Sequence, residues 1–214
     1  TGSRIQEALA LVTVAGLLAV VMRRARRTVR LQLEADAKRR SISEIFGQYV
    51  PRAVADMVIA DRGALAPTVR TATVHFVDIV SFTALTERIG PAKTVDVLNA
   101  YFDAATEIIG AHNGVVTQFQ GDAILATFNV PVADADHAGR AVDCAERILR
   151  SIATSEFAGE RLSVRIGMNT GLLIAGNVGG GGRQNYTVHG DAVNMAARLE
   201  AMNKETETTL LIAH

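Results

Sequence analysis

The stretch 114–128, "GVVTQFQGDAILATF", constrains the fold of this chain more than any other. Two apolar segments flank a Gly-Asp pair, a pattern typical of two antiparallel strands joined by a tight turn. Two strands joined in this way do not belong to a doubly wound parallel sheet, in which strands are linked by long crossovers. The stretch therefore predicts an antiparallel sheet, and it places the carboxyl group of Asp122 on the turn.

Strand and helix patterns alternate on both sides of this hairpin. "VRTATVHFVDI" predicts a strand that ends near Asp78, and Pro91 fits the first position of a helix that ends at "HNG". A second helix is expected from about 134 to 153. The inward face of the helix that starts at Pro91 is predicted to consist of Val95, Leu98, Phe102, Ala105 and Ile109.

The last third of the chain continues the alternation. "RLSVRIGMNTGLLIAGNVG" predicts two strands broken near Gly171, and "TTLLIA" begins a last strand. Between them, "GDAVNMAARLEAMN" predicts a helix with Met195, Leu199 and Met202 facing inward. Hairpins interleaved with helices predict an α+β fold, a ferredoxin-like or palm-type sandwich with a central, mostly antiparallel sheet and helices packed on it.

Charge is distributed unevenly along the chain. Residues 1–40 hold nine Lys or Arg against three Asp or Glu, whereas residues 41–214 hold thirteen against nineteen. The acidic balance of the globular part argues against nucleic acid as a partner, because such a partner requires a basic face. The single cysteine, Cys144, excludes an internal disulfide and fits a reducing compartment.

The basic N-terminal part contains an apolar run. Residues 8–22 carry no charge, and "RRARR" follows directly. A helix over this run would span about 22 Å, less than the roughly 30 Å of a bilayer core. We therefore interpret residues 1–22 as the C-terminal part of a transmembrane helix in the inner (cell) membrane, with the arginines on the cytoplasmic side; a buried helix is the alternative. Residues 23–66 predict a helical linker, and residues 67–214 a cytoplasmic globular domain.

The candidate functional residues are two carboxylates and the polar residues on one face of a later helix. Asp78 ends a strand and Asp122 lies on a hairpin turn, and in a central sheet these two places can be side by side. Carboxylates held close together repel unless a cation lies between them, and oxygen ligands suit Mg²⁺ or Mn²⁺ with a phosphate substrate. A turn or capping role for each aspartate is the alternative. Asp191, Asn194 and Arg198 share one helix face, which suits a sugar and a phosphate.

Three ordered motifs resemble those of the class III nucleotidyl cyclases. "VHFVDIVSFTALTE" resembles the first metal motif of that family and "TQFQGDAILATF" the second. "GNVGGGGRQNYTVHGDAVNMAARLE" resembles the signature around its transition-state residues. The resemblance covers roughly residues 69–214, and the N-terminal part with "EIFGQYVPRAVADMV" is similar to the bacterial membrane-anchored members. The chain ends before the family's last hairpin, which indicates a truncated C-terminal end of the catalytic domain.

The resemblance implies an adenylyl cyclase that converts ATP to cyclic AMP and pyrophosphate. In that family two ions, Mg²⁺ or Mn²⁺, are held by the aspartates matching Asp78 and Asp122 and by the backbone carbonyl matching Ile79. The residue matching Asn194 orients the ribose, and the one matching Arg198 stabilises charge on the pentavalent phosphate. The family works as a head-to-tail homodimer, with the metal aspartates from one chain and the Asn/Arg pair from the other. ATP and a second copy of the chain are thus the implied partners.

Further positions are implied to bind the substrate, and some depart from the family pattern. Phe82 and Thr83 belong to the first motif, where Ser81 replaces a frequent glycine. Gln118 and Thr187 match the residues that read the base. Adenylyl members usually carry Lys at the first of these positions and Asp or Thr at the second, whereas guanylyl members tend to carry Glu and a small residue. The pair favours adenine, with a guanylyl or relaxed-specificity cyclase and a catalytically silent signalling module as alternatives.

Overall fold

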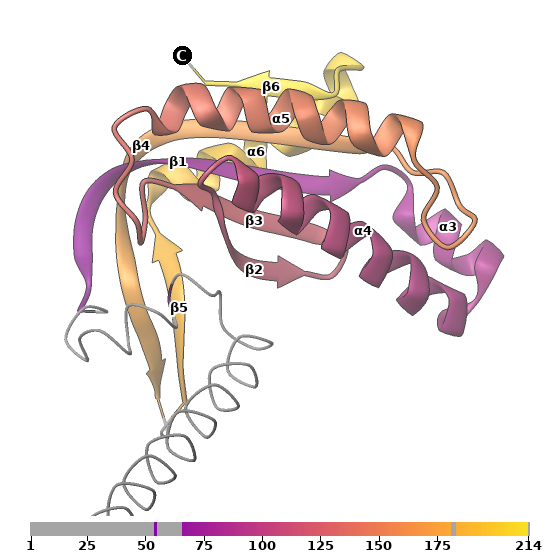
Figure 1. Cartoon of the computed structure of the whole chain (residues 1–214), viewed down its shortest axis with the longest axis horizontal. Helices are drawn as coiled ribbons and strands as arrows, with labels where there is room; N and C mark the ends of the chain where they lie inside the picture. Colours follow the sequence, from indigo (N-terminus) through magenta and orange to yellow (C-terminus); the bar gives the residue numbers. More distant parts are fainter. Residues whose placement is uncertain (1–53, 55–65, 181–182, 214) are drawn as a thin grey trace, which may run out of the picture. The chain divides into compact units, whose positions relative to one another are not determined.

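A computed structural model of the chain describes residues 54, 66–180 and 183–213 (Figure 1). The predicted transmembrane segment (1–22) lies outside these residues, as does nearly all of the predicted linker (23–66), so both stay predictions. None of the helices within the described residues combines the length and the hydropathy that a membrane span requires.

The strand predicted from "VRTATVHFVDI" lies at the centre of the sheet. Strand β1 (Thr68–Ile79) pairs antiparallel with β3 (Ala123–Phe128) on one side and with β4 (Val164–Gly180) on the other. The first four residues of β1 are exposed or half-buried. The eight that follow are buried or half-buried, so this part of the strand is covered on both faces of the sheet. This central position is the one expected for a β-branched segment with few charges.

Shorter strands complete the sheet. The predicted hairpin is confirmed, with β2 (Val115–Gln120) paired antiparallel to β3. Strand β5 (Arg183–His189) pairs antiparallel with the second half of β4, and β6 (Leu210–Ile212) pairs parallel with its first half. The strand order is β2-β3-β1-β4-β5. Every pairing except that of β6 is antiparallel, as the sequence predicts.

Helices cover both faces of this sheet. α4 (Pro91–Ala111) and α5 (His137–Thr154) pack on one face, and α6 (Asp191–Thr206) packs on the other against β4 and β1. In Figure 1, α5 passes in front of the strands and α6 lies behind them. A short helix, α3 (Phe82–Ile89), follows β1 and contacts α4. The α+β sandwich predicted from the sequence is confirmed.

The alternation along β1 divides the core into two clusters. Val77 and Ile79 belong to the larger cluster, under α4 and α5. Ala72 and Val74 belong to the smaller cluster, which includes Ala196 of α6. Successive side chains of a strand point to opposite faces, so β1 contributes to both.

The predicted break near Gly171 is wrong, because β4 continues through it. Gly171 is paired with Ala72 of β1, and the ladder is regular on both sides of the pair. A Cβ atom at Gly171 would lie 3.1 Å from the Cβ of Ala192 on α6. The glycine therefore allows a helix to approach the strand closely, whereas the sequence suggested a turn.

Two predicted helix faces also differ from the structure. On α4 Ala105 and Ile109 are buried as predicted, but the other fully buried residues are Val97 and Tyr101, and Val95 is 55% exposed. On α6 the predicted inward residues Met195 and Met202 are 40% and 46% exposed, and Leu199 is half-buried. The inward residues of α6 are instead Ala192, Ala196, Glu200 and Asn203.

Helix α3 was not expected from the sequence. It has only eight residues, and of its four apolar side chains only that of Leu85 is buried. Such a short segment is stabilised by packing rather than by intrinsic propensity.

Candidate active site

The sheet brings the two predicted carboxylates together. Asp78 is the penultimate residue of β1, and Asp122 lies on the β2–β3 turn beside it, after Gly121 with a φ of 67°. Because Val77 is paired with Ile124 of β3, the end of β1 and the hairpin turn lie at the same edge of the sheet. Both aspartates are half-buried.

The two carboxylates interact unfavourably in the absence of a cation. Burial, followed by the neighbouring Asp122 carboxylate, raises the pKa of Asp78 to about 7, and Glu200 adds a smaller contribution of the same sign. A hydrogen bond from the Ile79 backbone N–H acts in the opposite direction. Like charges in a half-buried site produce such a shift, and a bound cation would reverse it.

Two further charged residues, Arg165 and Glu200, form a charged cluster with the carboxylate pair, and neither was predicted from the sequence. Arg165 of β4 is paired directly with Asp78 of β1 and is half-buried. Glu200 of α6 is only 8% exposed. Burial raises the pKa of Glu200, the Arg165 guanidinium opposes that shift, and Asp122 adds to it. The sequence signal that could have indicated Arg165 is its place as a lone arginine in the apolar segment "SVRIGM".

A glycine allows Glu200 to reach the cluster. A Cβ atom at Gly167 of β4 would lie 2.0 Å from the backbone oxygen of Ala196 and 2.2 Å from the backbone nitrogen of Glu200. No side chain fits in that space, so α6 is pressed directly against β4. This close approach explains why a glutamate at the C-terminal half of α6 faces the sheet.

The chain turns sharply after the first aspartate. Ile79 is buried, and Ser81 has a φ of 57°, in the left-handed region that favours glycine. Phe82 and Thr83 then form the first turn of α3, with Phe82 half-buried against the core and Thr83 exposed. Backbone N–H groups at the start of a helix are suited to anions.

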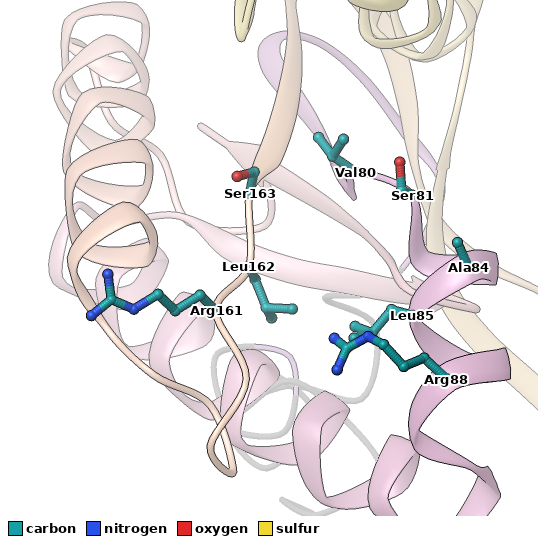
Figure 2. A pocket seen from close by; sticks show the side chains of 8 residues that line it. All are labelled: Val80, Ser81, Ala84, Leu85, Arg88, Arg161, Leu162 and Ser163. Atoms are coloured by element: carbon teal, nitrogen blue, oxygen red, sulfur yellow. The ribbon is translucent and has the colours of Figure 1, made fainter.

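A cavity of about 400 Å³ opens next to this turn. It lies between α3 and the segment that leads into β4, and Figure 2 shows Arg88 extending from α3 across it. Arg88 and Lys93 each lie 2.6 Å from an oxygen of Glu160, which ties α3 and α4 to the segment before β4. Neither Asp78 nor Asp122 lines this cavity, so the cavity is separate from the carboxylate pair. Its lining residues are Val80, Ser81, Ala84, Leu85, Arg88, Arg161, Leu162 and Ser163.

Asn194 and Arg198 lie on the opposite side of α6 from the carboxylates. Both are exposed, whereas Ala196 and Glu200 are buried against the sheet. Asn194 and Arg198 are each two residues from Ala196, which in a helix is a rotation of roughly 200°. The two side chains therefore project away from the sheet, and α6 separates them from Asp78 in the same chain.

The two predicted base-reading positions are on β2 and β5. Gln118 is exposed, and its side-chain oxygen accepts a hydrogen bond from Nε2 of Gln120 at 3.1 Å. Thr187 is half-buried on β5. Although β2 and β5 are at opposite ends of the strand order, they contact each other. The curvature of the sheet thus brings the two elements together.

The donor set of the carboxylate pair fits a hard divalent cation. Among the described residues, no group of three or more His, Cys, Asp and Glu side chains could hold a metal ion. Two carboxylates with a nearby backbone carbonyl leave further coordination positions for water or phosphate oxygens, as Mg²⁺ prefers.

Comparisons with known proteins agree on one family. The family model described as "Adenylate and Guanylate cyclase catalytic domain" matches residues 65–210. Adenylate cyclase 1 of Rhizobium meliloti (strain 1021) is 38% identical over 173 residues, which are 78% of this chain and 26% of that protein. The chain spans about a quarter to a third of the length of the curated relatives it matches.

Solved structures of both specificities are similar to this chain. A bacterial light-regulated adenylyl cyclase superposes with a TM-score of 0.73 at 27% identity, covering 87% of this chain and 55% of that one. The guanylate cyclase domain of RhGC from Catenaria anguillulae, solved with GTP, superposes with a TM-score of 0.60 at 32% identity, covering 63% of this chain and 74% of that one.

Proposed function

Because this chain belongs to the family of adenylate and guanylate cyclase catalytic domains, we propose that it is an adenylyl cyclase that converts ATP to cyclic AMP and pyrophosphate. In this reaction the ribose 3′-oxygen bonds to the α-phosphorus, and the bond from that phosphorus to the oxygen that bridges to the β-phosphate breaks. The hydroxyl proton passes to water, and pyrophosphate leaves. The observation that carries the proposal is the Asp78–Asp122 pair at one edge of the sheet.

The carboxylate pair is the proposed metal site. Asp78 and Asp122, with the Ile79 carbonyl, would hold two ions, Mg²⁺ or Mn²⁺. When bound, these ions lower the pKa of the attacking hydroxyl and neutralise phosphate charge. The half-buried position of both aspartates supports this role, since each residue remains partly accessible to a ligand.

Cationic and polar groups around the pair suit a triphosphate. We assign Arg165 to the phosphates, because it is paired with Asp78 across the sheet and its positive charge acts on the carboxyl cluster through Glu200. Phe82 and Thr83 would present backbone N–H groups from the first turn of α3. Arg198 would stabilise charge that develops on the α-phosphate, and Asn194 would orient the ribose.

The placement of Asn194 and Arg198 supports a site shared between two chains. Both project away from the sheet, so a single chain does not present them to the ligand held by its own aspartates. A head-to-tail homodimer would bring Asn194 and Arg198 of one chain to Asp78 and Asp122 of the other. Exposed apolar residues of β4 and α6 also favour an interface, namely Leu172, Ile174, Val178, Met195 and Met202.

The base is proposed to lie between β2 and β5. Gln118 and Thr187 would contact it, and a glutamine amide with a threonine hydroxyl can donate to and accept from adenine. A guanylyl or relaxed-specificity cyclase is the second candidate, favoured by the 32% identity to a guanylate cyclase domain.

A direct activity assay separates these candidates. Purified protein is incubated with ATP or GTP, each with Mg²⁺ or Mn²⁺, and the cyclic nucleotide is quantified. The proposal expects cyclic AMP from ATP at a higher kcat/KM than cyclic GMP from GTP. A clear preference for GTP would support the second candidate, and no product from either nucleotide would indicate a silent module.

The apolar run at 8–22 supports an anchored enzyme with its catalytic domain at the cytoplasmic face of the inner membrane. Fractionation of cells that express the chain with and without residues 1–22 tests this placement. The proposal expects the full chain in the membrane fraction and the shortened chain in the soluble fraction. Equal distribution of the two forms would contradict it.

A further inference from the structure

A hydrogen bond between two glutamines lies next to the carboxylate pair. Gln118 and Gln120 are two residues apart on β2, so their side chains leave the strand on the same side. Nε2 of Gln120 donates to Oε1 of Gln118 at 3.1 Å, and both side chains are exposed. Only Gly121 separates Gln120 from Asp122.

The residue between the two glutamines fixes the orientation of the strand. Phe119 points the other way and packs on Phe102 of α4, with 4.3 Å between the ring centroids. After a shift in register between Val116 and Gln118, β2 is also paired with β3, with Gln118 opposite Leu125 and Gln120 opposite Ala123. The strand cannot rotate without losing these contacts. With the backbone of β2 fixed in this way, the Gln118 side chain can still change which end of its amide, the oxygen or the nitrogen, it presents to a ligand.

The two ends of an amide recognise different bases. A side-chain oxygen accepts a hydrogen bond, and a side-chain nitrogen donates up to two. The Watson–Crick edge of adenine offers an acceptor at N1, whereas guanine offers a donor at N1 and another at its 2-amino group. An amide that presents its N–H groups thus suits adenine, and one that presents its oxygen suits guanine.

We propose that Gln120 is a specificity-determining residue. By donating to the oxygen of Gln118, it turns the N–H groups of Gln118 toward the base and thereby selects adenine over guanine. This inference rests on the proposed function, in which Gln118 contacts the base. Gln120 itself acts through Gln118 and is a positioning residue.

Three substitutions at position 120 test the direction of this effect. Gln120→Leu removes the donor, and the ATP-to-GTP selectivity should fall by about two- to tenfold, as the loss of one hydrogen bond of ordinary net strength predicts. Gln120→Glu accepts from the Gln118 N–H and turns its oxygen outward, so selectivity should fall by at least about tenfold, in line with a stronger charge-assisted bond. Gln120→Lys keeps a donor, and selectivity should stay within about twofold of the original.

The readout is a ratio, which removes the effect of the added charges. ATP and GTP carry the same triphosphate, so the interaction of a charge at position 120 with the phosphates cancels in the ratio. The ratio is measured as kcat/KM for the two nucleotides and, independently of turnover, as their dissociation constants in competition with a fluorescent ATP analogue.

The two measurements distinguish failure of the inference from failure of the proposed function. Absence of turnover with both nucleotides would overturn the proposed function, while the binding ratio would still test Gln120. Equal ratios in the original protein and in the Leu and Glu variants would overturn the inference. Tighter binding of GTP than ATP by the original protein would overturn it as well.

Discussion

The two faces of the sheet differ in what their side chains do. The face under α4 and α5 is closed by a large cluster of buried apolar residues that includes Phe128 and Ile148. The face under α6 has a smaller apolar cluster, and at its edge are Asp78, Arg165 and Glu200. Most of the apolar burial that stabilises the domain is thus on one face, and the two carboxyl groups whose pKa values are raised by burial, those of Asp78 and Glu200, are on the other.

This separation explains how the domain can remain folded with two repelling carboxylates. The carboxylate pair destabilises the metal-free protein, and the apolar core on the other face offsets that cost. Substitutions on the α6 side should therefore change activity more than stability, and substitutions on the α4/α5 side should do the reverse.

The largest expected effect is the loss of activity in Asp122→Ala. Removing one of two proposed metal ligands should reduce product formation by at least about hundredfold, a loss comparable to removing a charge-stabilising group from a transition state. The far-UV circular dichroism spectrum should not change. Asp143→Ala, an exposed aspartate on α5, is the matched control and should retain full activity. Undiminished turnover in Asp122→Ala would refute the metal assignment.

The opposite face should respond in the opposite way to Phe128→Ala. Phe128 is 1% exposed in the larger cluster, and its truncation should lower the free energy of unfolding by about 3–5 kcal/mol. The kcat of the molecules that remain folded should change little. Val69→Ala, at a residue that is 69% exposed, should change stability by no more than about 0.5 kcal/mol. If Phe128→Ala inactivated the enzyme without unfolding it, the two faces would not be separable.

The pH dependence of stability tests the repulsion between the two carboxylates on the α6 face. The pKa of Asp78 is raised to about 7 in the folded protein, from 3.8. Between these values the folded state binds a proton that the unfolded state has lost, so stability falls as the pH rises from about 4 to 7. Asp78→Asn should remove this loss and raise the unfolding free energy of the metal-free protein at pH 7.5 by about 1 kcal/mol, a value discounted because half of the carboxyl is open to solvent.

Urea unfolding in EDTA at pH 4 and pH 7.5 measures this effect. The Asn variant and the original protein should be equally stable at pH 4, where the carboxyl is largely protonated in the folded state. A variant that is less stable than the original at pH 7.5 would show that the carboxylates do not repel each other.

The smallest effect is expected at the turn that joins the two regions. Ser81 has a φ of 57°, which costs a non-glycine residue roughly 1–2 kcal/mol. Ser81→Gly relieves this strain but gains entropy in the unfolded chain, so stability should rise by about 0.5–1 kcal/mol in thermal unfolding. Ser81→Val should destabilise the protein, because β-branched residues tolerate this region poorly. Stabilisation by valine would contradict the assigned backbone conformation.

The part of the fold set by local pattern was predictable from the sequence. The hairpin at 114–128 and the strand ending near Asp78 combine β-branched residues with turn residues. Their joint placement also predicted that Asp78 and Asp122 lie together, because neighbouring strands bring their ends to one edge of the sheet.

The rest depended on tertiary contacts that no local pattern encodes. Glycine is a residue type common in turns, but in the structure Gly171 allows α6 to pack closely on β4. The methionines of α6 suggested the inward face, whereas two alanines, Glu200 and Asn203 occupy it, and Gly167 allows the helix to lie close to the strand. The sequence does not reveal the register of β4 against β1, which places Arg165 opposite Asp78, or the packing of α6, which brings Glu200 to the same cluster.

The central claim is that one active site takes its metal ligands from one chain and its transition-state residues from another. Mixing two inactive variants, Asp122→Ala and Arg198→Ala, tests it most directly. In a mixed dimer one of the two sites contains neither substitution, so random pairing should restore about a quarter of the original activity. An equimolar mixture that stays as inactive as each variant alone, although the chains exchange, would contradict the claim.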